Sequence, residues 1–252
     1  MAFNALILAG SRGGHDPLSD YAGVADKALI RIGDETMLAH VVDALRQAGA
    51  ARILVSASSE PVKAAAAELG VDALPAASGP SLSARQAFDL AGAPLLVTTA
   101  DHALLEPDWI RDFLADVPAD ADVAVLLARR ETIERDAAGT KRTYLRFADG
   151  DWSGCNLFLL ATPRAGAAID LWAQVEKDRK RPWRIVRKLG LGTLFRFVAG
   201  RLSLAQALGK LGALCDLRAA VVSARSGLAA VDVDKPADLD FVRAHLASRL
   251  AG

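Results

Sequence analysis

The sequence is poor in cysteine: only Cys155 and Cys215 occur among its 252 residues. Neither belongs to a CxxC pair or to a spacing typical of zinc ligands, so a disulfide framework and a zinc site are not expected. A protein that does without disulfides fits a reducing compartment, and we therefore predict a cytoplasmic protein.

Long apolar runs and an excess of one charge are also missing. No stretch of about 18 apolar residues occurs, which argues against a transmembrane helix, and residues 1–10 lack the basic start of a signal peptide. The 30 lysines and arginines balance 30 aspartates and glutamates, giving a formal net charge of zero. This balance argues against a protein that coats nucleic acid, so no nucleic-acid partner is expected.

The sequence is instead rich in hydrophobic residues, and these recur in a regular pattern. Hydrophobic residues make up 52% of the chain and charged residues 24%, which excludes a disordered or fibrous protein. Periodicity and turn residues predict strands alternating with helices through the first half of the chain. The strands are expected at 1–10, 51–58, 93–101 and 121–130, with a weak one at Leu74 and a long loop at 11–26; the helices are expected at 36–48, 61–70, 81–91 and 107–116.

This alternation predicts an α/β fold, a three-layer Rossmann-like arrangement with a mostly parallel sheet flanked by helices. The second half is less regular and predicts an inserted α+β portion. Its strands are expected at 143–148, 155–161, 218–223 and 229–233, with a turn at 149–154, and its helices at 163–178, at 203–213 and from Pro236. Because no linker interrupts the chain, we predict a single domain over 1–252.

A glycine-rich loop follows the first strand. Gly10, Gly13 and Gly14 allow a ligand to approach the backbone, and Arg12 and Lys27 supply cations for phosphate. The loop is neither a Walker A motif nor GxGxxG, so a simple strand–helix connection is an equally good interpretation.

Two segments with acidic residues fall where an open parallel sheet binds ligands. Asp101 ends the apolar strand 93–101. Asp232 and Asp234 alternate with valines, so both of these carboxylates point to one side of an extended segment. Asp101 and Asp234 together predict a Mg²⁺ site. Helix capping near Pro107 and Pro236 is the alternative.

The neutral total hides a basic segment at 177–201, where nine basic residues stand against Asp178 alone. It could form a helical lid whose apolar residues pack on the core, or it could hold a phosphorylated acceptor. It could also contact an anionic membrane peripherally.

Six segments together resemble the MobA-like nucleotidyltransferases, most strongly over 4–128 and 228–245. They are LAGSRGG, DKALIRIGDETML, SGPSLSARQAF, TTADHALL, SGCNLFLL and VDVDKPADL. The resemblance implies the nucleotide-diphospho-sugar transferase type of fold. It also implies Mg²⁺-dependent transfer of an NMP from GTP or CTP to a phosphorylated small-molecule or lipid-like acceptor, with release of pyrophosphate.

The resemblance also assigns parts of the chain. Residues 1–128 would bind NTP, 129–215 would form the acceptor-binding and lid portion, and 216–252 would return to complete the metal site. The implied catalytic residues are Arg12, Lys27 and Asp101, and the implied metal ligands are Asp101 and Asp234. The implied nucleotide-binding residues are Leu8, Ala9, Gly10, Ser11, Arg12, Gly13, Lys27, Gly79, Ser81 and Ser83, and the acceptor-binding residues are Gly154 and Asn156.

Two other functions remain open at this level. Asp232-Val233-Asp234 has the form of the DxD motif of nucleotide-sugar-dependent glycosyltransferases. The first loop is longer than the compact family loop, with Lys27 followed by Ala28 rather than proline, which leaves room for a catalytically idle nucleotide-binding regulatory module.

Overall fold

The computed structural model describes residues 2–10, 17–177 and 190–250. The predicted phosphate-binding residues Ser11, Arg12 and Gly13 therefore lie outside the described residues. So does much of the basic segment 177–201, from 178 to 189.

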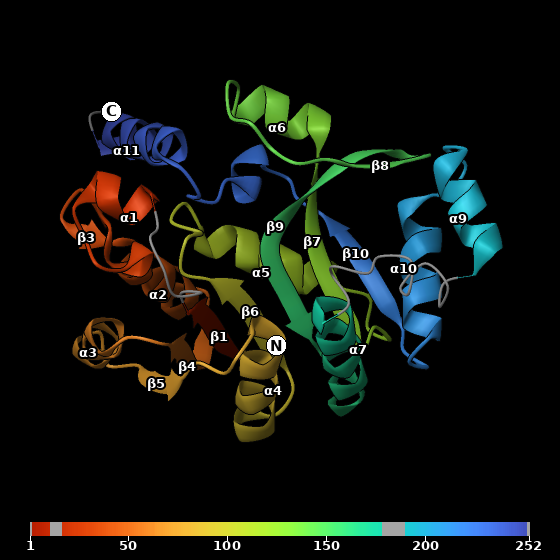
Figure 1. Cartoon of the computed structure of the whole chain (residues 1–252), viewed down its shortest axis with the longest axis horizontal. Helices are drawn as coiled ribbons and strands as arrows, with labels where there is room; N and C mark the ends of the chain where they lie inside the picture. Colours follow the sequence, from red (N-terminus) through yellow and green to blue (C-terminus); the bar gives the residue numbers. More distant parts are fainter. Residues whose placement is uncertain (1, 11–16, 178–189, 251–252) are drawn as a thin grey trace.

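The main sheet crosses the middle of the molecule (Figure 1) in the strand order β10-β7-β9-β6-β1-β4-β5. These strands are β1 (Phe3–Ala9), β4 (Ala50–Ala57), β5 (Asp72–Pro75), β6 (Leu95–Thr99), β7 (Val123–Arg129), β9 (Gly150–Leu160) and β10 (Ala219–Ser223). Neighbours pair in parallel except that β9 runs antiparallel to both β6 and β7. The predicted mostly parallel sheet is confirmed, and a strand of the inserted portion lies near its centre.

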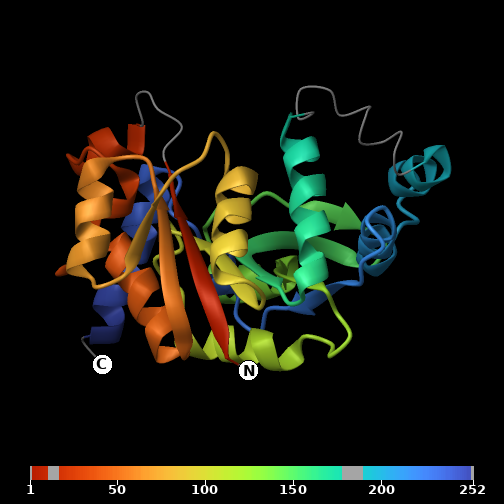
Figure 2. The ribbon, with the colours of Figure 1, turned by 90° about the horizontal axis from the view of Figure 1, so that it is seen from below.

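Helices cover both faces of this sheet, as alternation along β1 shows. Phe3, Ala5 and Ile7 pack in one cluster with buried residues of α2 (Met37–Gln47), α3 (Glu60–Glu68) and α5 (Pro107–Asp116). Leu6 points the other way and packs with α4 (Pro80–Ala91) and α7 (Gly166–Lys177). Figure 2 shows α4 and α7 side by side on that second face. The three-layer prediction is thereby confirmed.

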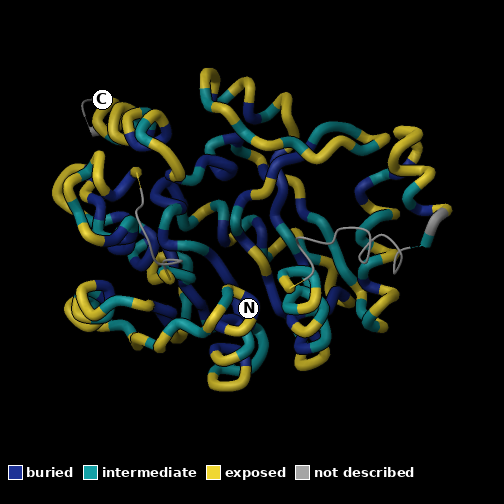
Figure 3. Tube along the Cα trace, in the orientation of Figure 1, coloured by how far each residue is buried: buried dark blue, intermediate teal, exposed yellow. Residues whose placement is uncertain are grey.

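The remaining elements extend this frame. They are α1 (Pro17–Ala22), α6 (Arg130–Asp136), α9 (Leu191–Val198), α10 (Leu204–Ala213), α11 (Pro236–Leu250), the 3₁₀ turns η1 (Lys27–Leu29), η2 (Pro163–Ala165) and η3 (Gly227–Ala230), and the short strands β2 (Arg31–Ile32), β3 (Glu35–Thr36) and β8 (Leu145–Phe147). β8 pairs with β9, and Leu204 of α10 packs on Leu127 and Trp152 at that end of the sheet. The tube in Figure 3 is buried along the central strands and exposed along the outer helices. Within the described residues, no helix has the length and apolarity needed to cross a bilayer.

Three local predictions were wrong. The expected loop at 11–26 contains α1, which starts at Pro17, a residue suited to the first turn of a helix. Most of the expected turn at 149–154 belongs to β9, because the reversal closes earlier, at Gly150 with φ +129°. The segment 229–233 does not form a strand of the sheet. It begins within η3 and continues as extended chain, with Val231 and Val233 buried.

Candidate active site

The candidate active site lies at the carboxyl end of β6, where three distant segments meet. Lys27 opens the turn η1, Asp101 follows β6 by two residues, and Asp234 precedes α11. This is the edge at which open α/β sheets bind ligands.

Lys27 joins the two predicted metal ligands. Its ammonium Nζ lies 2.7 Å from Oδ2 of Asp101 and 2.5 Å from Oδ1 of Asp234. The Lys27 and Asp101 side chains are only 26% and 19% exposed, whereas Asp234 is 63% exposed. The structure thus brings the two predicted carboxylates together on the ammonium of the predicted Lys27, and the Asp234 side of this cluster is open to solvent.

The charges at this point support one another. Burial alone would lower the pKa of Lys27, but the charges and hydrogen bonds of Asp101 and Asp234 outweigh it, so that pKa is raised. Burial likewise acts to raise the pKa of Asp234, and the hydrogen bond and charge of Lys27 reverse the shift and lower it. The ammonium and its partner therefore stay charged at neutral pH.

Backbone contacts hold the acidic segments in register. The Val233 amide donates to the Asp101 carbonyl oxygen at 3.0 Å, which explains why 231–234 is extended without belonging to the sheet. The Thr99 hydroxyl donates to Oδ1 of Asp101. These contacts fix the spacing of the carboxylates before any ligand arrives.

Asp232 contacts a different set of groups from Asp234. Nδ2 of Asn156, a predicted acceptor-binding residue, donates to Asp232 Oδ2 at 3.1 Å, and Arg142 pairs with the other oxygen. Burial, followed by the charges of Asp234 and Asp101, raises the pKa of Asp232. Gly154 lies exposed on the same strand as Asn156.

The donor set fits a divalent cation with few protein ligands. Carboxylate oxygens of Asp101 and Asp234 converge on one cationic atom, Nζ of Lys27. Among the described residues, no three His, Cys, Asp or Glu side chains are grouped closely enough to hold a metal on their own. Mg²⁺ commonly takes one or two protein carboxylates and completes its shell with water and substrate phosphates, so this arrangement suits it.

The predicted nucleotide-binding residues fall into two described groups. Leu8, Ala9 and Gly10 end β1 beside the site, and Leu8 and Ala9 are half-buried. A Cβ at Gly10 would lie 3.3 Å from the Ala76 Cβ, so this turn leaves little room for a side chain.

The second group opens α4. The Ser81 amide and hydroxyl donate to Glu176 Oε2 at 3.3 and 2.6 Å, and a Cβ at Gly79 would lie 2.3 Å from Glu176 Oε1. The Ser83 hydroxyl accepts from the Ala77 amide at 3.0 Å. Glu176 of α7 therefore caps α4 across the two halves of the chain.

Sequence reasoning missed both Glu176 and Arg142. Neither belongs to a motif, and a glutamate near a helix end or an arginine before a strand is ordinary in any protein. Only the folded contacts single them out.

His102, beside Asp101, is buried at 1% exposure, and burial lowers its pKa to about 4. Below about pH 6.5 this imidazole is protonated in the unfolded chain but stays neutral in the native protein. The free energy of unfolding therefore falls as the pH drops from about 6.5 towards 4. We expect His102→Gln to remove about 2 kcal/mol of the stability loss between pH 7 and pH 5. Urea unfolding of both proteins at the two pH values checks this; equal losses would contradict it.

The described part of the basic segment does not pack as a simple lid. α9 leaves Phe195 70% exposed and Val198 76% exposed, with Arg196 between them. Phe197 makes an edge-on contact with Phe147, at 5.8 Å between ring centroids. The apolar side of this helix is therefore only partly covered.

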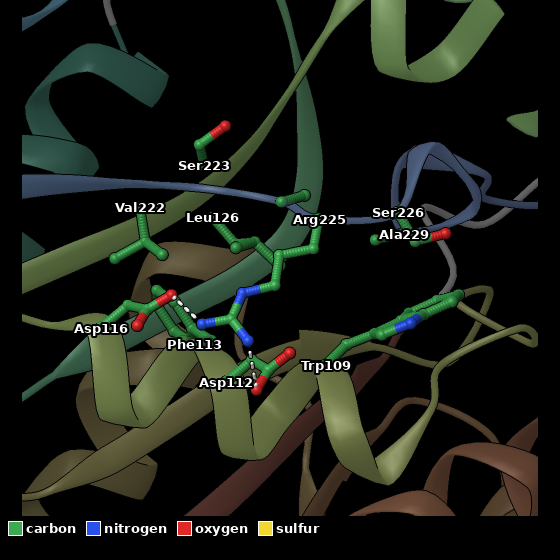
Figure 4. Close-up of a pocket in the computed structure, with 11 residues that line it drawn as sticks. Trp109, Asp112, Phe113, Asp116, Leu126, Val222, Ser223, Arg225, Ser226 and Ala229 are labelled. Atoms are coloured by element: carbon green, nitrogen blue, oxygen red, sulfur yellow. Dashed lines mark hydrogen bonds and ion pairs between the residues drawn. The ribbon is translucent and has the colours of Figure 1, made fainter. Parts of the chain in front are cut away.

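A small pocket between α5 and the segment that follows β10 contains a cluster of ion pairs (Figure 4). Arg225 reaches from beyond β10 to Asp112 and Asp116 on α5, each at 2.9 Å. Two carboxylates against one guanidinium leave this cluster with a formal negative charge, which does not suit a phosphate-bearing substrate.

Comparison with known proteins shows the family to which the chain belongs. The model of the MobA-like NTP transferase domain matches residues 5–191. The chain belongs to this family. Its members transfer nucleotides, so the protein is a nucleotidyltransferase, and an NTP is its substrate.

Solved structures show the same fold. A hypothetical transferase from Thermus thermophilus is 29% identical, with a TM-score of 0.80 over 95% of this chain and 100% of that one. A CMP:2-keto-3-deoxy-manno-octonic acid synthetase in complex with CTP is 18% identical, with a TM-score of 0.59 over 99% and 100%. A nucleotidyl transferase from Methanothermobacter thermautotrophicus is 18% identical, with a TM-score of 0.59 over 98% and 99%. No curated protein matches the sequence.

Proposed function

We propose that this MobA-like transferase moves an NMP from GTP or CTP to a phosphorylated acceptor, with Mg²⁺ held by Asp101 and Asp234. The observation that carries the proposal is the convergence of both carboxylates on Lys27 at the carboxyl end of β6. The fold shared with a CTP-bound synthetase supports a pyrimidine nucleotide as one of the two candidates.

In this reaction a phosphate oxygen of the acceptor attacks the α-phosphorus, and the bond to pyrophosphate breaks. Such transfers need in-line positioning and charge neutralisation rather than a protein nucleophile. Magnesium, when bound, offsets charge on the phosphates. Lys27, already charged between the carboxylates, would contact the incoming phosphates through its ammonium group. Arg12 of the glycine-rich loop is proposed to bind the same phosphates.

The acceptor is proposed to bind on the Asn156 side of Asp232. A cavity of about 530 Å³ lies between α6 and residues 137–144. Asn156 and Asp232 are not among its lining residues, but Arg142 lines it and pairs with Asp232. Lys141 also lines it and supplies a positive charge suited to an acceptor phosphate.

A thermal-shift screen of the four NTPs with Mg²⁺ tests the substrate. A ligand that binds only the folded state raises the melting temperature. We expect GTP or CTP to give the largest shift, and ATP or UTP as the preferred nucleotide would contradict that assignment. Pyrophosphate release with a panel of sugar and polyol phosphates then tests turnover.

The two alternatives predict other products. A glycosyltransferase would consume a nucleotide sugar without pyrophosphate, and family membership speaks against it. An idle regulatory module would bind NTP tightly and release no pyrophosphate with any acceptor.

Peripheral contact with an anionic membrane stays a prediction, supported by the exposed Phe195 and Val198 of α9. Phe195→Ser combined with Val198→Ser should reduce co-sedimentation with vesicles containing phosphatidylglycerol. Leu90→Ser, which alters a 51% exposed leucine on α4, is the control. Wild-type protein that stays in the supernatant at low salt would refute the contact.

A further inference from the structure

Arg142 is a buried charge with no part in the phosphate transfer outlined above, although it lines the cavity proposed for the acceptor. Its side chain is only 5% exposed, although arginine is seldom buried without a specific reason. It lies between α6 and β8, in the portion of the chain predicted to bind the acceptor, yet its partners belong to the C-terminal return.

The guanidinium connects two carboxylates of that return. Nη1 donates to the Asp232 carboxylate and, at 3.2 Å, to the Asp232 carbonyl oxygen. Nη2 donates to Asp238, which is 3% exposed. A planar fork of this kind sets direction as well as charge, which a lysine could not reproduce.

Asp238 connects Arg142 to the backbone at Asp234, the predicted metal ligand. Its Oδ2 accepts from the backbone amides of Asp234 and Lys235, each at 3.2 Å. Arg142 therefore restrains the segment around Asp234. It binds the Asp232 side chain directly, and through Asp238 it holds the backbone turn at Asp234 and Lys235.

Stability alone explains this arrangement poorly. Nε of Arg142 is buried and has no hydrogen-bond partner among the described residues. A buried ion pair with an unsatisfied donor often contributes less stability than apolar packing of the same volume. The arrangement is better explained by what Arg142 does to the neighbouring carboxylates.

We infer that Arg142 is a positioning residue for nucleotidyl transfer: it orients Asp232 and the Asp234 turn, and so couples the acceptor side of the site to the metal side. The inference rests on the proposed function, because the carboxylates it orients are the proposed cation site and its neighbour. Arg142 itself touches no reacting atom in this account.

Steady-state kinetics on Arg142→Met and Arg142→Lys, at a temperature where circular dichroism shows both folded, tests the inference. We expect kcat to fall at least about tenfold in both variants, with KM for the NTP within about threefold of wild type. Arg142→Lys should recover melting temperature but not kcat, because it restores charge without the fork.

A double-mutant cycle with Asp232→Asn sharpens the test. If Arg142 acts through Asp232, the double variant should be no slower than the slower single variant. Hydrogen exchange supplies a readout independent of turnover: amides in 230–238 should exchange faster in Arg142→Met. Arg225→Met, which also removes an arginine held by two aspartates, here Asp112 and Asp116 of α5, should leave kcat unchanged.

Wild-type kcat in folded Arg142→Met, with only the melting temperature lowered, would show a purely structural role and overturn the inference. A raised KM with unchanged kcat would overturn it too, since that is the signature of a substrate contact. If Asp101→Asn abolishes pyrophosphate release while Arg142→Met does not, this inference fails and the proposed function stands. If wild type releases none with any acceptor, the function itself fails.

Discussion

Asp101→Asn should lower pyrophosphate release from NTP and Mg²⁺ by about a thousandfold or more. The substitution keeps the shape of a side chain that is 19% exposed but removes the charge shared by the cation site and Lys27. A residue used only to cap the helix near Pro107 would instead change stability and leave kcat nearly intact. Pyrophosphate release at saturating NTP, with the acceptor found in the panel, measures the effect.

Asp108→Asn is the matched control for this change. Asp108 is an aspartate of α5 that pairs with Arg111, and its side chain is 84% exposed. Its variant should retain activity within about twofold, because exposed ion pairs contribute little. Retained turnover in Asp101→Asn would remove the metal assignment.

Lys27→Met should lower kcat/KM by about a hundredfold or more, since it removes the cation offered to the phosphates. It also leaves Asp101 and Asp234 facing each other without the ammonium between them. We therefore expect a lower melting temperature without ligand and a larger rise on adding Mg²⁺ than in wild type. Initial rates and melting curves across a Mg²⁺ titration check both effects.

Lys63→Met is a close control for Lys27→Met. Lys63 pairs with Glu60 at 2.7 Å, and its side chain is 29% exposed against 26% for Lys27. Its variant should keep wild-type rates. Equal losses in the two variants would mean that losing a paired lysine, rather than its place in the site, causes the defect.

The fold was predictable where sequence pattern and packing agree. The apolar runs at 3–9 and 95–99 are buried on both faces, so their strands and their parallel partners follow from composition and rhythm. The segment 229–233 has the right alternation, but no strand of the described residues pairs with it. Its Val233 amide donates instead to the Asp101 carbonyl oxygen. Alternation of apolar and polar residues indicates which side chains are buried, but it does not indicate which segment of backbone forms hydrogen bonds with the strand.

The site was predictable only in its main charges. Lys27, Asp101 and Asp234 stood out because charges at strand ends are poorly explained by packing, and the structure brings them together. Arg142 and Glu176 act through contacts between segments far apart in the chain, 142 with 232 and 176 with 81. Such pairs leave no local pattern, since each residue is ordinary in its own segment.

The most direct test is a crystal structure with Mn²⁺ and a non-hydrolysable analogue of the NTP chosen by thermal shift. The account predicts an anomalous peak bonded to carboxylate oxygens of Asp101 and Asp234, with Lys27 moved from between them to the phosphates. Nucleotide bound with Mn²⁺ away from both carboxylates, and Lys27 still bridging them, would contradict it.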